Sequence, residues 1–228
     1  MTHRAPGPAS RTVPRPVPRA IECLLLFAGM PLLLYLDTPH LPHLPKIPVL
    51  AASTLLCLAL LWRDPAFQRA RLWNARAILS EDGTALRTIL WRAGLVFLLA
   101  CGLVALTDPA GLFAFPRSKP VVWLIVCLLY PWLSAYPQEL VYRTFFHHRY
   151  AVLFPGYTGR IAASALAFGL MHVIFDNYWA PALSTAGGVL FARTYERTGS
   201  TAAVGLEHAL YGLAVFTSGL GKYFYEGF

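Results

Sequence analysis

Long apolar segments alternate with short polar connections along most of the chain. Seven runs are long enough to cross a bilayer as helices, because roughly 20 helical residues span its hydrocarbon core and slightly shorter runs suffice where the bilayer is thin or deformed. They cover approximately residues 20–36, 47–62, 88–107, 120–136, 160–176, 179–197 and 200–217, and the fourth continues as a helical pattern to about residue 150. The pattern predicts an all-α fold, a polytopic membrane bundle of about seven transmembrane helices.

The composition favours a membrane protein over a soluble one. Hydrophobic residues make up 57% of the 228 residues and charged residues only 13%, which leaves too little polar surface for a soluble domain of this length. The net charge of +8 does not indicate nucleic-acid binding, because the basic residues lie between apolar segments and not on one continuous basic face. We therefore expect the lipid bilayer, and no nucleic acid, as a partner.

The basic residues also predict the orientation. Lys and Arg are retained on the cytoplasmic side, and they are enriched before the first run, in the 63–87 connection and in the turns after the fourth and sixth runs. This places the N-terminus in the cytoplasm and the C-terminus outside. Residues 1–19, rich in Pro and Arg, are predicted to form a disordered cytoplasmic arm, and residues 20–228 a single integral-membrane domain. The 63–87 connection is interpreted as a solvated loop, with an interfacial helix over 66–73 as the alternative.

Glu139 and Arg143 place a carboxylate and a guanidinium one helical turn apart in the extended fourth run. Ionisable residues at membrane depth are functional by default, which favours a site. Two structural alternatives remain open. The pair can be a structural ion pair, or Gln138 and Glu139 can serve a helix N-terminus that begins at Pro137.

Two histidines are predicted to lie at the depth of Glu139. The fourth and fifth runs form a hairpin that turns at Pro155, with Glu139 16 residues before it and His172 17 residues after it. At about 1.5 Å of rise per residue the two sit at nearly equal depth. His208, nine residues beyond Gly199, belongs to the same half of the membrane. Convergence in one cavity raises the case for each, although either histidine can also be a neutral residue that bonds between helices.

Neighbours of these residues add to the candidate site. Phe168 precedes His172 by one turn, and Glu207, next to His208, is able to orient or charge an imidazole. Two further histidines, His147 and His148, lie near the cytoplasmic end and are interpreted as interfacial.

At these residues the sequence resembles the CPBP family of intramembrane proteases, which includes CAAX prenyl endopeptidases and bacterial relatives linked to bacteriocin processing and immunity. The resemblance covers roughly residues 120–217. The family's EExxxR motif corresponds to residues 138–143, its FxxxH motif to Phe168 through His172, and its third motif, a His followed four residues later by Asn or Asp, to His208 and Gly212. The resemblance implies an intramembrane glutamic-type endopeptidase, of a class once regarded as metalloproteases.

The chain departs from the family at two positions. Gln138 stands at the first motif glutamate, to which the role of general base is commonly given, and an amide cannot take a proton from water. Gly212 stands where a side chain would help to hold an oxyanion. The alternative function is therefore a catalytically silent membrane scaffold, an immunity or partner-binding module of the same fold.

The chemistry assigned from the sequence is peptide hydrolysis without a cofactor. Glu139 is the predicted base, His172 orients the water, His208 donates to the oxyanion, and Gln138 hydrogen-bonds water or substrate, with Arg143 favouring the charged form of Glu139. The resemblance implies a membrane-tethered or leader-type peptide as the substrate and a bacterial inner membrane as the location. A zinc site built from two His and a Glu ranks below this mechanism because no HExxH spacing is present. A carrier or proton relay is a weaker rival, since no inverted halves are visible.

Overall fold

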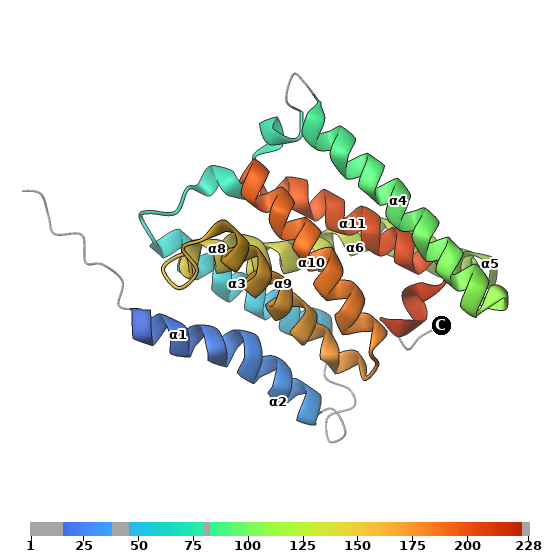
Figure 1. Cartoon of the computed structure of the whole chain (residues 1–228), viewed down its shortest axis with the longest axis horizontal. Coiled ribbons are helices and arrows are strands. Elements are labelled where there is room, and N and C mark those ends of the chain that lie inside the picture. The colour runs from blue at the N-terminus through green and yellow to red at the C-terminus, as the bar shows by residue number, and fades with distance from the viewer. Residues whose placement is uncertain (1–15, 38–45, 80–82, 225–228) are drawn as a thin grey trace, which may run out of the picture.

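The computed structural model describes residues 16–37, 46–79 and 83–224, and its regular elements are all helices over these ranges. The α-helices are α1 (Pro16–Leu24), α2 (Met30–Asp37), α3 (Lys46–Arg63), α4 (Thr84–Thr107), α5 (Ala114–Ser118), α6 (Pro120–Tyr130), α7 (Tyr136–Glu139), α8 (Phe146–Arg149), α9 (Tyr157–Met171), α10 (Trp179–Thr198) and α11 (Thr201–Ser218). The elongated helices lie side by side in one bundle (Figure 1). The predicted all-α fold is confirmed.

Five helical stretches are long and apolar enough to cross a membrane within the described part of the chain, and they coincide with the first five predicted runs. They are Pro16–Leu36, Lys46–Arg63, Thr84–Thr107, Pro120–Arg149 and Tyr157–Phe175. The last two predicted runs are present as α10 and α11 but do not belong to this group. The chain is an integral membrane protein; seven spans and a cytoplasmic N-terminus stay predictions.

The first helix begins at Pro16, so residues 16–19, the end of the predicted arm, are helical. Residues 1–15 lie outside the described residues. Between α3 and α4 the described residues form only two short 3₁₀ turns, Arg69–Leu72 and Ala75–Ala77. The segment is a loop apart from these turns, and an α-helix over 66–73 is not formed. Its solvation on the cytoplasmic side stays a prediction.

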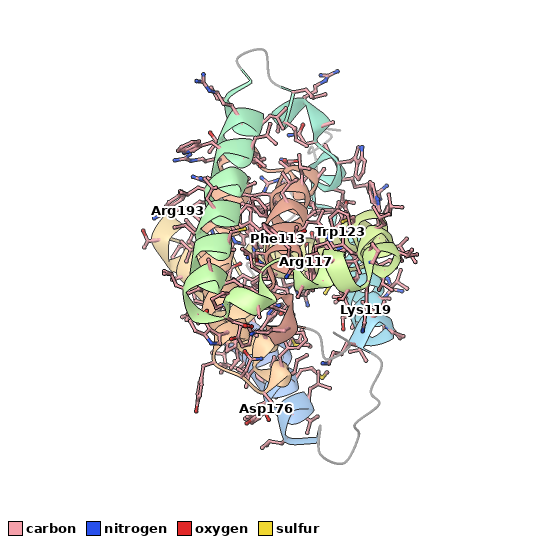
Figure 2. The ribbon with its side chains drawn as sticks, turned by 90° about the vertical axis from the view of Figure 1, so that its right-hand side faces the viewer. Phe113, Arg117, Lys119, Trp123, Asp176 and Arg193 are labelled. Carbon is pink, nitrogen blue, oxygen red and sulfur yellow. The ribbon has the colours of Figure 1, made fainter. Side chains whose placement is uncertain are left out.

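Local sequence explains how the chain turns from α9 to α10 and from α10 to α11. Asp176 adopts a left-handed φ of 51°, and the Asn177 side chain accepts a hydrogen bond from the backbone N–H of Ala180 at 2.9 Å, which caps α10. Gly199 ends α10 with a φ of 57°, a conformation that glycine adopts without strain. Ser200 then caps α11 by accepting from the N–H of Ala203 at 3.1 Å. Figure 2 places Asp176 at the tip of the α9–α10 hairpin.

Small residues allow α9 and α10 to approach closely. A Cβ atom at Gly188 would lie 3.0 Å from the backbone Cα of Ala165, so only glycine fits there at the present helix separation. Such contacts are typical of membrane bundles, in which small residues bring backbones together. Beyond this pair, α11 lies between α10 and α4 (Figure 1).

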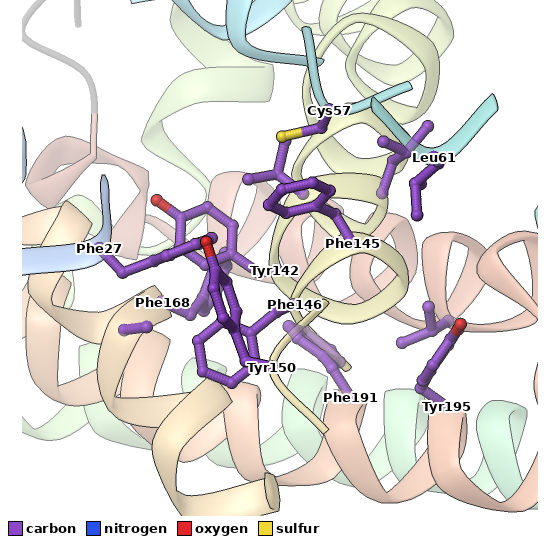
Figure 3. Close-up of a cluster of buried hydrophobic side chains, with 14 of the residues drawn as sticks. Phe27, Cys57, Leu61, Tyr142, Phe145, Phe146, Tyr150, Phe168, Phe191 and Tyr195 are labelled. Atoms are coloured by element: carbon purple, nitrogen blue, oxygen red, sulfur yellow. The ribbon is translucent and has the colours of Figure 1, made fainter. Parts of the chain in front are cut away.

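Aromatic side chains fill the centre of the bundle (Figure 3). The Phe27 ring meets the edges of Tyr142, Phe146 and Tyr150 with centroids 5.1–5.8 Å apart, so α1–α2 is joined to the helix that carries Glu139. Outer faces carry exposed aliphatic side chains, such as Leu98 at 68% and Leu106 at 86% exposure. Exposed apolar surface of this kind is expected where helices face lipid.

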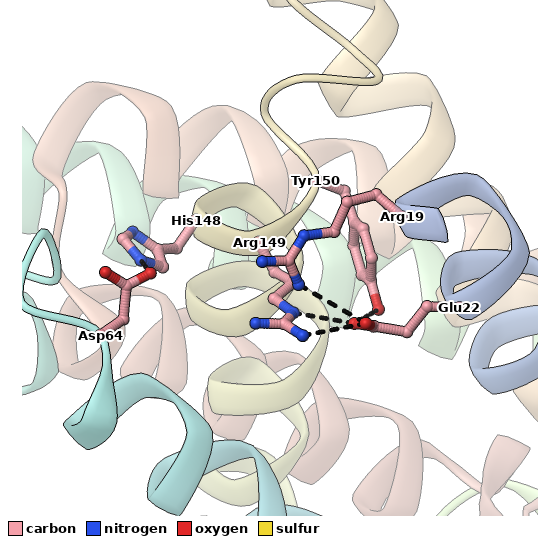
Figure 4. A network of polar contacts seen from close by, with 6 residues as sticks. All are labelled: Arg19, Glu22, Asp64, His148, Arg149 and Tyr150. Atoms are coloured by element: carbon pink, nitrogen blue, oxygen red, sulfur yellow. Dashed lines mark hydrogen bonds and ion pairs between the residues drawn. The ribbon is translucent and has the colours of Figure 1, made fainter. Parts of the chain in front are cut away.

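A polar network joins three helices where α8 ends (Figure 4). Glu22 on α1 accepts hydrogen bonds from Arg149 at 2.8 and 2.9 Å and from the Tyr150 hydroxyl at 3.0 Å. Nearby, His148 pairs with Asp64 just after α3 at 2.9 Å. These contacts fix the end of the Glu139 helix against α1 and α3.

Candidate active site

The helix that carries Glu139 is continuous from Pro120 to Arg149, but it is wound more widely on both sides of α7. Residues Pro131–Ala135 and Leu140–Phe145 form π-helical turns. A π-turn adds a residue to the turn and changes which side chains face one another, and such turns occur frequently at functional sites. Glu139 therefore lies between two local distortions of its helix.

Glu139 is the charged centre of the site, with an exposed fraction of 0%. Its Oε1 lies 2.7 Å from Nδ1 of His208, and its Oε2 lies 3.0 Å from Nε of Arg143. The contact with Arg143 is an ion pair and not a hydrogen bond, because the N–H of Nε is poorly aligned with Oε2. Oε2 therefore accepts no hydrogen bond from any described residue. The carboxylate is thus held by a cation on one side and an imidazole on the other.

Arg143 is also fully buried, and aromatic rings surround its guanidinium where an exposed arginine would be hydrated. Its guanidinium lies 4.4 Å from the centroid of Phe168 and 5.4 Å from that of Phe191. Both rings belong to the cluster drawn in Figure 3. Its Nη2 donates to the backbone oxygen of Gly188 at 3.2 Å, at the close approach of α9 and α10. Cation–π attraction and the ion pair together stabilise this buried charge.

Both predicted histidines lie against the same ring. Phe168 meets His172 with centroids 4.6 Å apart and His208 with centroids 5.4 Å apart. Nδ1 of His172 lies 2.7 Å from the backbone oxygen of Phe168, so this nitrogen carries the proton and donates it. Nε2 of His172 is left as an acceptor. The structure therefore places Glu139, His172 and His208, the three residues of the depth argument, in one set of contacts with Arg143 and Phe168.

Gln138 and Glu207 bond to residues outside this cluster. The Gln138 amide nitrogen donates to the Ser134 hydroxyl at 2.7 Å. Glu207 accepts from the Tyr211 hydroxyl at 2.9 Å and lies 3.3 Å from Arg92 of α4. These partners of Oε1 join α11 to α4, because adjacent helical residues point about 100° apart. That Glu207 orients or charges an imidazole of the site stays a prediction.

Gly212 faces a residue that the sequence did not single out. A side chain at this position would collide with the ring and hydroxyl of Tyr130, the last residue of α6. Tyr130 also lies edge-on to His208, with centroids 6.0 Å apart. The one signal in the sequence was the glycine at position 212, where the resemblance leads us to expect a side chain; it did not point to Tyr130.

The other two histidines of the described residues have partners elsewhere. His147 lies 2.9 Å from Glu196 of α10, and His148 lies 2.9 Å from Asp64. Within the described ranges, no group of three or more His, Cys, Asp or Glu side chains is arranged to hold a metal ion. What the cluster offers chemically is a carboxylate, two imidazoles and a phenol around one buried cation.

Comparison with known proteins finds one matching family model. Residues 117–214 match the family model described as type II CAAX prenyl endopeptidase Rce1-like. The match contains every predicted site residue, and it confirms the resemblance that the three motifs indicated. No curated protein and no solved structure matches the chain.

Proposed function

We propose that this membrane protein, whose residues 117–214 match the CAAX prenyl endopeptidase family, is an intramembrane endopeptidase. Its substrate is a membrane-tethered or leader-type peptide, and one peptide bond of that substrate is hydrolysed by an activated water. The observation that carries the proposal is the 2.7 Å contact between Glu139 and His208 within an apolar bundle. A carboxylate paired with an imidazole is a common base unit in hydrolysis.

The geometry supports a division of work between Glu139 and His208. The sequence predicted Glu139 as the base itself, but its carboxylate is completely buried while the His208 side chain keeps 7% exposure. When Nδ1–H of His208 donates to Glu139, Nε2 presents its lone pair to water. We therefore assign proton abstraction to Nε2 of His208 and stabilisation of the resulting imidazolium to Glu139.

Two proton transfers through His208 accompany the proposed hydrolysis. Nε2 of His208 takes a proton from water, and the hydroxide oxygen forms a bond to the carbonyl carbon of the substrate. The tetrahedral intermediate then collapses, the C–N bond breaks, and His208 returns the proton to the leaving amine. His172, whose Nε2 accepts, orients the attacking water. No metal takes part in this scheme.

The test is cleavage of prenylated, membrane-tethered and leader-type peptides by protein purified into liposomes. Glu139→Gln keeps the shape of the side chain and removes its charge, and we expect it to lower kcat by on the order of 10³-fold or more. Glu207→Gln is the matched control, because it neutralises the neighbouring buried carboxylate, whose partners are Arg92 and Tyr211. Equal losses in both variants contradict the assignment, and loss of activity with a chelator favours the zinc alternative.

One observation favours the silent scaffold as a second candidate. Gln138 occupies the position of the first motif glutamate and is held by Ser134, so it offers no carboxylate to the site. Gln138→Glu separates the two functions. If the wild type cleaves and Gln138→Glu gains little, the Glu139–His208 pair is sufficient. If only Gln138→Glu cleaves, the natural chain is a silent binding module.

The proposed location is a bacterial inner membrane with the N-terminus in the cytoplasm. It is supported by the resemblance to compact bacterial members of the family and by the distribution of basic residues. Single cysteines introduced in the 63–87 connection of a variant with its four native cysteines replaced test the orientation. Labelling by a membrane-impermeant reagent only after the membrane is opened supports it, and labelling of intact cells contradicts it.

A further inference from the structure

One face of α11 carries His208 and Gly212, the two residues that correspond to the third motif. His208, Gly212 and Phe216 are spaced by four residues, so they lie along the same side of the helix. Gly212 contributes no side chain to this face. The ring and hydroxyl of Tyr130 occupy the volume that any side chain at 212 would need.

Tyr130 is fixed in that volume by the residues on either side. Its ring lies edge-on to His208 at 6.0 Å and edge-on to Phe216 at 5.3 Å, with interplanar angles of 78° and 81°. A π-helical turn follows it at once, beginning with Pro131. Aromatic contacts on both edges restrict the ring, and the hydroxyl makes no hydrogen bond to any described residue. The ring thus lies beside His208, and the hydroxyl lies against Gly212 with its proton available.

We propose that the Tyr130 hydroxyl donates the hydrogen bond that stabilises the oxyanion, in place of the side chain that Gly212 lacks. This inference rests on the proposed hydrolysis. During that reaction the carbonyl oxygen of the substrate gains negative charge, and a neutral phenol can donate to it without giving up its proton. The adjacent His208 activates the water that attacks the carbonyl carbon. The Tyr130 hydroxyl would donate to the carbonyl oxygen of the same group.

The alternative role for Tyr130 is to fill space beside a glycine. The two roles differ in what the oxygen atom does, since a filler needs the ring alone. Tyr130→Phe removes only that oxygen and keeps both ring contacts. If the hydroxyl stabilises the oxyanion, we expect kcat to fall by about 10²-fold with KM within a few-fold of wild type, the loss typical for one oxyanion donor.

Tyr211→Phe is the matched control, because the Tyr211 hydroxyl is bonded to Glu207 on another face of α11. Its kcat should stay within about three-fold of wild type, and an equal fall in both variants would point to general loosening of α11. Rescue provides an independent test. Tyr130→Ala opens the volume, and adding Gly212→Asn places an amide donor there. The double variant should regain at least ten-fold over Tyr130→Ala alone.

A binding measurement distinguishes failure of this inference from failure of the proposed function. A lipid-anchored peptidyl phosphonate carries a stable anionic tetrahedral group, and its Kd can be measured without turnover. Tyr130→Phe should raise that Kd at least ten-fold while leaving the Kd of the corresponding amide peptide unchanged. If the wild type cleaves but Tyr130→Phe cleaves and binds phosphonate as well as the wild type, the hydrolase stands and the role of Tyr130 is refuted. If nothing cleaves but phosphonate affinity depends on Tyr130, the donor site stands without the reaction.

Discussion

The close approach of α9 and α10 predicts that Gly188→Ala damages both stability and the site. A Cβ at this position would lie 3.0 Å from the Cα and 3.3 Å from the Cβ of Ala165. Ordinary contacts of this kind are about 3.4–4 Å, and the neighbour is backbone, which cannot turn aside as a flexible side chain does. The two helices must therefore move apart by several tenths of an ångström.

The expected cost follows from two opposing effects. Overpacking a well-filled contact costs about 1–3 kcal/mol. Replacing glycine by alanine within a helix returns up to about 1 kcal/mol. The net expectation is destabilisation by about 1–2 kcal/mol, or a lower Tm by roughly 2–8 °C for a chain of this size. Because the Gly188 carbonyl accepts from Arg143, the same movement lengthens the contact that holds the guanidinium near Glu139.

Gly102→Ala is the matched control. Gly102 lies inside α4, and a Cβ there would meet nothing within 4 Å, so this variant isolates helix propensity. Thermal unfolding of both variants in one detergent should show Gly188→Ala less stable than the wild type and Gly102→Ala equally or more stable. The reasoning is refuted if Gly188→Ala matches the wild type in Tm and in peptide cleavage.

Three further predictions concern polar contacts outside the site. Arg92→Ala leaves the buried Glu207 carboxylate without its cation, and we expect a loss of about 3 kcal/mol in denaturant unfolding. Lys222 holds the pKa of Asp108 below its usual value by a hydrogen bond and Asp108 raises the pKa of Lys222, so their mutual stabilisation is present at neutral pH. It is lost as pH falls through the pKa of Asp108 or rises through that of Lys222, and Tm profiles of wild type and Asp108→Asn should converge in acid. Glu22→Gln removes the charge that binds Arg149 and Tyr150, and hydrogen exchange in α1 should rise.

Each of these predictions has a contradicting result. For Arg92, the double variant Arg92→Met, Glu207→Gln should regain most of the stability, and no recovery would show that Arg92 acts through packing. For Asp108, a constant difference in Tm down to strongly acid pH contradicts the charge effect. For Glu22, unchanged exchange in α1 means that aromatic packing around Phe27 alone holds this helix.

The lengths of the apolar runs were sufficient to predict the long helices. Within a membrane a single apolar segment can hydrogen-bond all its backbone N–H and C=O groups only as a helix. Those lengths did not predict α5 or the π-helical turns around α7, which depend on local packing and on Pro131 and Pro137. The runs that became α10 and α11 are helical as predicted. Their small and polar residues, such as Ser184 and Thr201, are buried inside the bundle, which explains why hydropathy alone describes them less well.

The sequence was sufficient to predict the depth of the site residues along their helices. Equal distances from the Pro155 turn indicated that Glu139 and His172 lie at one level, and the contact of Glu139 with His208 agrees with the third part of that argument. Direction around the helix could not be predicted in the same way. Glu207 and Gln138 each adjoin a site residue but point to other partners, and Tyr130 reaches Gly212 only through tertiary packing.

The structure also gives a physical reason for the aromatic residue of the FxxxH motif. The face of Phe168 attracts the Arg143 cation and offers no acceptor that would compete with Glu139, while its ring contacts both His172 and His208. Its role therefore depends on the charge in the first motif and on the imidazole of the third. The departures from the family lie outside this set of contacts, because residue 138 bonds Ser134 and residue 212 faces Tyr130. Gln138 and Gly212 change which polar groups are available to a substrate, whereas the buried Glu139–Arg143 pair keeps its partners. A glutamine at position 138 is therefore compatible with an intact set of contacts around Glu139.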